Sequence, residues 1–265
     1  MIRGYPGGKQ SNNTLQKLIN GLPQAQIFID VFGGSAAVSV SAWKSGKYKS
    51  VVYNDKDSQI VDTLVTIRDY PKQTLDRLFI TPHSRYYMEN VCEDEMKSDN
   101  HIIKAAATIY YYAVGIGHTH KPPFFMKPGI RHDNSVSHSA ESVRRTFARV
   151  FEDYETLLEI TLENRDAEKI INRYSTGGNG YNPEKVLFFF DPPYGKTNKY
   201  RVGFDDMEML KKIFTGKWKC AICGTDESLS FIEDYANCVD LSGGSFRAKG
   251  SFRQKMILNY NSQLF

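Results

Sequence analysis

Apolar residues along the chain gather in short runs that predict the strands of a parallel sheet. The run Val186–Phe190 is the strongest, with five consecutive apolar residues, mostly aromatic, that end abruptly at two prolines. An uninterrupted run of this length is typical of a strand that is buried on both faces. Shorter runs over Ile27–Asp30 and Val51–Asp55 predict two further strands, and the apolar residues from Ala37 to Trp43 predict a helix between them.

Weaker patterns of the same two kinds fill the rest of the chain. One helix is expected to be capped by Ser11 or Asn12. Further helices are expected over 60–67, 102–114, 140–158, 167–174 and 207–214, and strands over 159–166, 219–223 and 256–260. Strands and helices alternate outside 57–159, whereas inside this range they do not. We therefore expect a doubly wound, Rossmann-like α/β core formed by residues 1–56 and 160–265, with a mainly helical insert at 57–159.

The composition is that of an ordinary globular protein, which excludes several other classes. The 265 residues are 41% hydrophobic and 24% charged, and the apolar runs fall far short of the roughly 20 residues of a membrane helix. Since the N-terminus also lacks a signal-peptide pattern, we expect a cytoplasmic protein without a membrane partner. A net charge of +4 is compatible with a polyanionic partner, and 16 Tyr and 16 Phe supply rings that can stack on bases.

Neither the cysteines nor the histidines predict a metal centre. Cys220 and Cys223 form a C-x-x-C pair, but no second pair accompanies them and the residues between them are apolar. We expect all four cysteines to be reduced core residues. Four of the six histidines fall between residues 115 and 139, but their spacing is irregular and no carboxylates cluster with them. We therefore expect no metal ion.

The acid that follows the central strand carries the strongest chemical signal. Proline fixes φ and lacks an N–H, so Asp191-Pro192-Pro193-Tyr194 leaves the sheet in a stiff turn at the carboxyl edge, where open α/β sheets bind ligands. A planar aminated base can stack on the Tyr194 ring while its amino group donates hydrogen bonds to the Asp191 carboxylate and the Pro192 carbonyl. The alternative is a Pro-Pro turn with an exposed Asp191, since short motifs also occur by chance.

Two further motifs favour an adenosine-type cofactor. The turn Gly33-Gly34-Ser35 consists of small residues, which let a ligand approach the backbone closely. Asp55 lies 21 residues beyond Gly34 at the end of the next strand, the usual spacing for a carboxylate that holds ribose hydroxyls. Near the N-terminus, Gly7-Gly8-Lys9 combines a permissive backbone with a positive charge, although a flexible tail is the alternative there.

Basic and aromatic residues gather in segments that suit a phosphate backbone and splayed bases. The residues that we expect to contact a nucleic acid in this way are Lys121, Lys127 and Arg131 in the segment 115–139, Arg144 and Arg145 on the helix that follows, and Lys249 and Arg253 in the turn 247–255. Phe124 and Phe125 lie within the first of these segments. A solvated surface loop is the alternative for that segment.

The order of these motifs resembles that of the Dam-like, alpha-group (D12 class) DNA adenine-N6 methyltransferases, over most of the chain. Asp191–Tyr194 resembles their catalytic tetrapeptide, and Tyr200 with Phe204 resembles the tail behind it, which makes Tyr200 a further expected DNA contact. The residues that match motifs for S-adenosylmethionine are Tyr5, Gly8, Lys9, Asp30, Phe32, Gly34, Asp55 and Asp166. Val31 and Ala36 depart from the family pattern, in which Pro and Gly are more frequent.

The resemblance implies a methyltransferase core with an inserted target-recognition domain at 57–159. It further implies methyl transfer from S-adenosylmethionine to adenine N6 in double-stranded DNA, after the base has been flipped out of the helix. On this basis Asp30, Phe32 and Gly34 lie on the methionine side of the cofactor, Asp55 at its ribose and Asp166 at its adenine.

Three alternatives to this function remain. An amino-methyltransferase acting on cytosine N4 is disfavoured because such enzymes usually have Ser before the two prolines, and one acting on RNA is a second possibility. A DNA-binding protein that has lost catalysis is disfavoured by the intact Asp191, Asp55 and Gly34.

Overall fold

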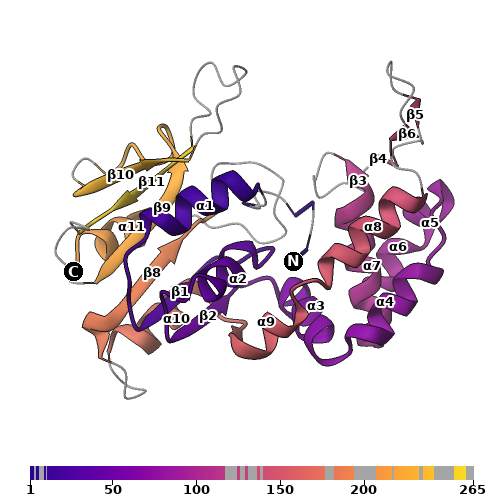
Figure 1. Cartoon of the computed structure of the whole chain (residues 1–265), viewed down its shortest axis with the longest axis horizontal. Coiled ribbons are helices and arrows are strands. Elements are labelled where there is room, and N and C mark those ends of the chain that lie inside the picture. The colour runs from indigo at the N-terminus through magenta and orange to yellow at the C-terminus, as the bar shows by residue number, and fades with distance from the viewer. Residues whose placement is uncertain are drawn as a thin grey trace. The chain divides into compact units, whose positions relative to one another are not determined.

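The chain divides into two units (Figure 1). The structure, a computed structural model, describes residues 1–2, 4–5, 9, 11–116, 124–125, 129–130, 136–137, 140–176, 182–193, 207–216, 218–232, 235–241 and 254–260. The helical unit comprises Met1–Gly8, Asp57–Glu159 and Asn198–Arg201. The sheet unit comprises Lys9–Lys56, Ile160–Thr197 and Val202–Phe265.

A seven-stranded sheet lies at the centre of the sheet unit, in the order β10-β11-β9-β8-β1-β2-β7. The strands are β1 (Ile27–Asp30), β2 (Ser50–Asn54), β7 (Thr161–Glu163), β8 (Val186–Phe190), β9 (Lys219–Thr225), β10 (Asn237–Asp240) and β11 (Gln254–Leu258). From β7 to β9 the neighbouring strands pair in parallel, whereas β11 pairs antiparallel with both β9 and β10. The predicted doubly wound α/β core is confirmed, and β8 is its central strand, with every residue 0% exposed.

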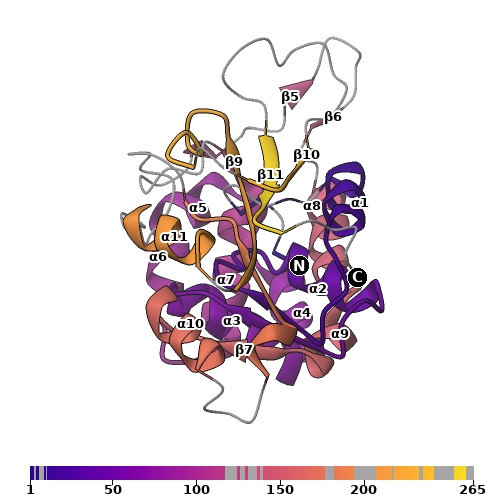
Figure 2. The same cartoon turned by 90° about the vertical axis from the view of Figure 1, so that its left-hand side faces the viewer.

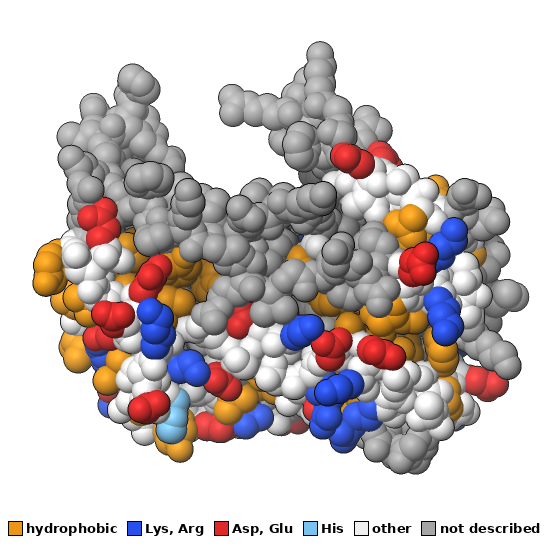
Figure 3. Space-filling model, turned by 180° about the vertical axis from the view of Figure 1, so that it is seen from behind, with side chains coloured by type: hydrophobic (Ala, Val, Ile, Leu, Met, Phe, Trp, Pro, Cys, Tyr) orange, Lys and Arg blue, Asp and Glu red, His pale blue; other side chains and the backbone are white. Residues whose placement is uncertain are grey.

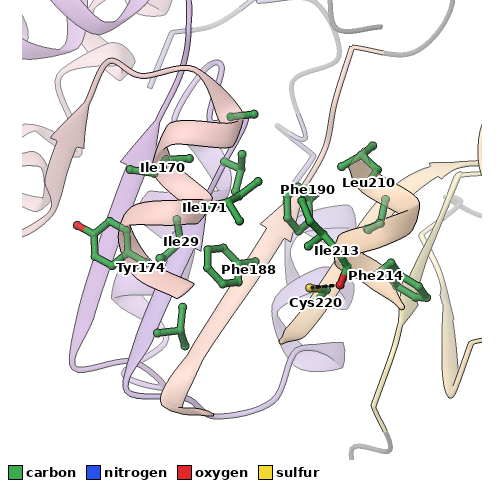
Figure 4. Packing of buried hydrophobic residues seen from close by; sticks show 14 of the residues in the cluster. Ile29, Ile170, Ile171, Tyr174, Phe188, Phe190, Leu210, Ile213, Phe214 and Cys220 are labelled. Carbon is green, nitrogen blue, oxygen red and sulfur yellow. Dashed lines mark hydrogen bonds between the residues drawn. The ribbon is translucent and has the colours of Figure 1, made fainter. Parts of the chain in front are cut away.

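Helices cover both faces of this sheet. α1 (Asn12–Gly21) and α2 (Ala37–Lys44) lie on one face, and α10 (Ala167–Ser175) and α11 (Met207–Phe214) lie on the other (Figures 1 and 2). Because side chains alternate along a strand, Phe188 and Phe190 point toward α10 and α11, where they join an apolar cluster (Figure 4). Phe28 and Phe189 stack on each other with ring centroids 5.8 Å apart and lie outside that cluster. Burial of each ring contributes roughly 1.5–3 kcal/mol to stability.

The helical unit is built around α7 (His101–Val114). This helix packs against α3 (Ser58–Asp69), α4 (Pro71–Ile80), α6 (Cys92–Glu95) and α8 (Ala140–Val150), and α5 (Arg85–Asn90) and α9 (Tyr154–Glu159) complete the helices described for this unit. Four two-residue strands form two antiparallel pairs: β3 (Gly115–Ile116) pairs with β4 (Phe124–Phe125), and β5 (Gly129–Ile130) pairs with β6 (Val136–Ser137). Gln59 is buried between α3 and α7 and donates hydrogen bonds to Met96 O (3.1 Å) and Thr108 Oγ1 (2.8 Å). The role of this unit in target recognition stays a prediction.

Several details of the expected elements are wrong. The helix expected over 140–158 is broken into α8 and α9, because the Phe151 N–H bonds to the Ala148 carbonyl in the tighter i−3 pattern that ends α8. The segment 115–139 contains the short strands β3 to β6 in addition to loop. β7 is shorter than expected, β9 extends two residues past Cys223, and β11 begins and ends two residues early. The sequence patterns did not predict the helices α4, α5 and α6 or the strand β10.

The expectation that all four cysteines are core residues is wrong for one of them. Cys238 is exposed because it lies on the edge strand β10, whereas the other three cysteines are buried.

The described residues show neither a membrane-spanning helix nor a metal-binding cluster. No helix in these ranges has both the length and the apolar character needed to cross a bilayer. Within the same ranges, no three His, Cys, Asp or Glu side chains are placed to hold a metal ion together. The four histidines between residues 115 and 139 lie outside the described residues.

Candidate active site

Four acidic residues lie at the carboxyl edge of the sheet. Asp30 is the last residue of β1, and Asp55, Asp166 and Asp191 follow β2, β7 and β8 respectively. β1 pairs in parallel with both β2 and β8, and β2 pairs in parallel with β7, so these four strands are neighbours that end at the same edge. Asp55 and Asp166 therefore follow adjacent strands. This edge is where open α/β sheets bind their ligands.

Asp191 forms a shielded ion pair with Lys9. Lys9 Nζ lies 2.5 Å from Asp191 Oδ2, and the two side chains are only 6% and 16% exposed. Breaking a buried ion pair by removing one partner is generally destabilising. Lys9, which the sequence predicts as a cofactor contact, is therefore placed against the predicted catalytic acid. Pro192 and Pro193 follow Asp191 in the chain; Pro192 is buried and Pro193 is half-buried.

Asp30 is deeply buried, with 1% of the residue exposed. Its Oδ2 accepts a hydrogen bond of 2.7 Å from Ser39 Oγ on α2, whereas its Oδ1 has no hydrogen-bond partner among the described residues. Burial is the main cause that raises the pKa of the Asp30 carboxyl to about 7; the Ser39 hydrogen bond and the Lys9 charge oppose the rise, and the charges of Asp191 and Asp55 add to it. The unsatisfied oxygen suits a ligand that carries a cationic donor group.

The turn between β1 and α2 is held from both sides by residues at the end of β2. The Tyr53 hydroxyl donates to the Gly34 carbonyl at 2.9 Å, and the Gly34 N–H donates to Asp55 Oδ2 at 2.8 Å. Gly33 lies so close to the Tyr53 ring that a Cβ atom would stand 2.2 Å from Cε2, so no larger residue fits there. Ala36, where related motifs more often have glycine, adopts a φ of 63°, in the left-handed region that glycine enters most readily.

Asn54 joins the ends of three neighbouring strands. Its Nδ2 donates to the Val31 carbonyl at 3.0 Å and to the Arg165 carbonyl at 3.1 Å, and its Oδ1 accepts from the Arg165 N–H at 3.0 Å. Since Arg165 immediately precedes Asp166, Asn54 fixes the loop that carries this acid. Asp166 itself is half-exposed in an ion pair of 2.7 Å with Lys56, which is the main reason that its pKa is lowered.

The remaining predicted cofactor residues have other surroundings. Phe32 packs against Phe190, with ring centroids 6.4 Å apart. Tyr5 belongs to the helical unit, where its ring lies 5.2 Å from that of Tyr112. Gly8 lies outside the described residues.

Most of the predicted DNA contacts also lie outside the described residues. These are Tyr194, the stacking ring of the tetrapeptide, together with Tyr200, Lys121, Lys127, Arg131, Lys249 and Arg253. Arg144 and Arg145 are described and are exposed on α8. On the face of the molecule shown in Figure 3, the Lys and Arg side chains of the described residues are interspersed with Asp and Glu rather than gathered into one basic area.

Sequence reasoning missed three residues that hold this edge together. They are Ser39, Tyr53 and Asn54, all of which are buried. Ser39 and Asn54 are polar residues next to apolar ones in α2 and β2, and their burial without a partner would be costly. That conflict was visible in the sequence, although it could not show which group each side chain contacts.

Comparisons with known proteins give one strong match. A family model described as D12 class N6 adenine-specific DNA methyltransferase matches residues 5–213. No curated protein sequence matches the chain. Among solved structures, the rRNA methyltransferase aviRa from Streptomyces viridochromogenes aligns with 97% of this chain and 88% of its own, at 11% sequence identity and a TM-score of 0.35, a likeness that is too low to carry an argument.

Proposed function

The chain belongs to the D12 class of N6 adenine-specific DNA methyltransferases, and we propose that it transfers a methyl group from S-adenosylmethionine to N6 of an adenine in double-stranded DNA. The observation that carries this proposal is the position of Asp191, which follows the buried central strand and forms a shielded ion pair with Lys9. The target adenine is bound at the carboxyl edge of the sheet, beside this acid.

The acids of this edge fit the methyl donor. Asp30 offers a buried carboxylate oxygen that lacks a partner among the described residues, which suits the ammonium group of the methionine part. Asp55 already accepts one hydrogen bond from the turn that follows β1 and is the carboxylate assigned to the ribose. Asp166 follows the adjacent strand and is assigned to the adenine of the donor. When bound, the donor supplies a methyl group activated by a sulfonium centre.

Asp191 prepares the target nitrogen for attack. Adenine N6 is a poor nucleophile because its lone pair is delocalised into the ring. Hydrogen bonds from the amino group to the Asp191 carboxylate and the Pro192 carbonyl favour a more tetrahedral nitrogen and offset the positive charge that develops on it. The methylated nitrogen then loses one proton, and the Asp191 carboxylate is the base within hydrogen-bond reach of it.

Lys9 keeps Asp191 ready for this role. Its ammonium group contacts Oδ2, so we assign Oδ1 to the target amino group. Lys9 is therefore a positioning residue for the catalytic acid as well as part of the N-terminal cofactor motif.

The target base must leave the duplex to reach this edge. Flipping is required because N6 is held in a base pair within the helix, and Tyr194 is assigned to stack on the extruded base. We assign the helical unit and the basic segments 115–139 and 247–255 to contact the duplex around the flipped base. The exposed Arg144 and Arg145 on α8 are part of this assignment.

The function is tested by sequencing the DNA of cells that express the protein, with detection of modified bases. We expect N6-methyladenine at one recurring sequence in cells with the wild-type protein and none in cells with Asp191→Ala at equal expression. A matched control is Asp99→Ala, which changes an exposed acid in the helical unit and should leave the modification intact. Unmodified adenine in the wild-type cells would favour a DNA-binding protein without activity, and methylated cytosine N4 would favour a different amino group as the target.

A further inference from the structure

The carboxylate of Asp30 is held by one oxygen only. Ser39 Oγ donates to Oδ2 at 2.7 Å, whereas Oδ1 is fully buried without a hydrogen-bond partner among the described residues. A buried carboxylate oxygen that accepts no hydrogen bond is costly, by roughly 1–3 kcal/mol or more. The arrangement is therefore suited to a donor group that arrives with a ligand.

Ser39 is an unusual residue at its position. It lies in the first turn of α2 between Val38 and Val40 and is 0% exposed. A buried hydroxyl destabilises a protein unless it is hydrogen-bonded, and serine is a poorer helix former than alanine. The hydrogen bond to Asp30 accounts for a serine here, because it fixes the rotamer of a carboxylate at the end of the neighbouring β1.

We propose that Ser39 is a positioning residue that holds Asp30 by Oδ2, so that Oδ1 binds the ammonium group of the amino-acid part of the methyl donor. The inference rests on the proposed function, since it takes S-adenosylmethionine as the ligand. It goes beyond that function in assigning Ser39, a residue outside the family motifs, to donor binding and to the pH at which binding occurs.

The charges around Asp30 predict the direction of the pH effect. The neighbours are Ser39 on α2, Asp55 after β2, Asp191 after β8, and Lys9. Cys223 on β9 is also close, but burial raises its thiol pKa well above the usual value and it stays neutral. The pKa of Asp30 is raised to about 7, and the ionised form binds a cation, so donor affinity should fall as the pH drops through this value. Because the Ser39 hydrogen bond lowers that pKa, its loss should move the fall in affinity to higher pH.

The test compares two ligands that differ only in the amino-acid part. S-adenosylhomocysteine carries the ammonium group, whereas 5′-methylthioadenosine lacks the amino-acid portion. With Ser39→Ala, calorimetry at pH 7 should show about tenfold weaker binding of S-adenosylhomocysteine, the order of one hydrogen bond to a charged group. Binding of 5′-methylthioadenosine should be unchanged. The matched control is Ser41→Ala, a partly buried serine on the same helix, which should leave both affinities and the pH profile unchanged.

The possible results separate this inference from the proposed function. Selective loss of S-adenosylhomocysteine affinity, with its pH dependence moved upward, supports the role of Ser39. Equal loss of both ligands, or an unchanged pH profile, overturns it and leaves the proposed function standing. A wild-type protein that binds neither ligand contradicts both. If Ser39→Ala does not fold, Asp30→Asn replaces it, for which the same selective loss is expected and an equal loss overturns the inference.

Discussion

At the scale of single residues, the site depends on a few close contacts that leave no room for substitution. The Gly34 peptide is held by the Tyr53 hydroxyl on its carbonyl and by the Asp55 carboxylate on its N–H. Gly33 packs directly against the Tyr53 ring. These contacts set the shape of the turn against which the methyl donor is proposed to bind. Tyr53 is therefore part of the site, although it is fully buried and touches no ligand in the proposal.

Gly33→Ala should damage both stability and donor binding. The added Cβ would stand 2.2 Å from Tyr53 Cε2, and the ring cannot move freely because it is fully buried. We expect a loss of roughly 1–3 kcal/mol in the free energy of unfolding, measured by urea denaturation, the usual cost of overpacking. S-adenosylmethionine affinity should fall as well, because the turn must shift.

Two variants check the cause of this effect. Gly46→Ala meets no atom within 4 Å, so its cost should be limited to the strain of its positive φ, about 1 kcal/mol, and it should leave donor affinity unchanged. Combining Gly33→Ala with Tyr53→Leu removes the ring edge and should recover part of the lost stability. No loss of stability in Gly33→Ala alone would show that the turn tolerates a side chain.

At the scale of elements, the buried Asn54 and the partly buried Asn259 tie strand ends to neighbouring loops at different places in the sheet unit. Asn54 makes three hydrogen bonds among β1, β2 and the loop before α10. Asn259 also makes three, with the N–H of Cys220 and the carbonyls of Phe214 and Trp218. Only Asn54 lies next to the acids assigned to the cofactor. Comparing the two asparagines therefore separates a general effect on stability from an effect on the site.

Asn54→Ala and Asn259→Ala should destabilise the protein by similar amounts but differ in their affinity for S-adenosylmethionine. Each change removes three hydrogen bonds to backbone groups that are at least partly buried, and we expect each to cost roughly 2–4 kcal/mol in urea denaturation. S-adenosylmethionine affinity, measured by calorimetry below the unfolding range, should fall about tenfold or more in Asn54→Ala only. Equal donor affinities in the two variants would contradict the view that Asn54 positions Asp55 and Asp166.

The elements themselves differ in how well the sequence predicts them. β8 and β1 were predictable because an uninterrupted apolar run has few alternatives, and the parallel arrangement followed from the helices between them. The helices α4, α5 and α6 were not predictable, because they are short, follow one another closely and do not alternate with strands. The acids Asp55 and Asp191 were predictable from their position after a strand. The contacts made by Ser39, Asn54 and Lys9 were not, because they join residues that are distant along the chain, 182 positions apart for Lys9 and Asp191.

At the scale of the whole molecule, the proposed partner is DNA, a polyanion. A protein can contact DNA at its phosphates and at the edges of its bases. The described residues in Figure 3 mix acidic and basic side chains, so these residues alone form no extended basic area on that face. The basic segments 115–139 and 247–255 are therefore the principal candidates for DNA contacts. Contacts to phosphate set the overall affinity, and contacts to base edges set the choice of target.

Lys249→Ala should weaken binding to all duplexes by a similar factor. If Lys249 contacts a phosphate, its loss should reduce the slope of log affinity against log salt by about one, independent of sequence. Competition binding with matched and scrambled duplexes at several salt concentrations measures both quantities. Lys72→Ala is the control, since this exposed lysine on α4 pairs with Asp76 and should contribute nothing. A change in target preference without a change in salt slope would assign Lys249 to a base instead.

The most direct test of the central claim is a single-turnover measurement of methyl transfer by Asp191→Asn, with donor binding measured in parallel. Asparagine has the shape of aspartate and still offers an oxygen to Lys9, so the ion pair is replaced by a hydrogen bond rather than a cavity. We predict that transfer to an adenine-containing duplex falls by roughly 100-fold or more, the scale of a lost electrostatic contact in the transition state. Affinities for S-adenosylmethionine and DNA should stay close to those of the wild type. Transfer by the variant at near the wild-type rate would contradict the assignment of Asp191 as the catalytic acid.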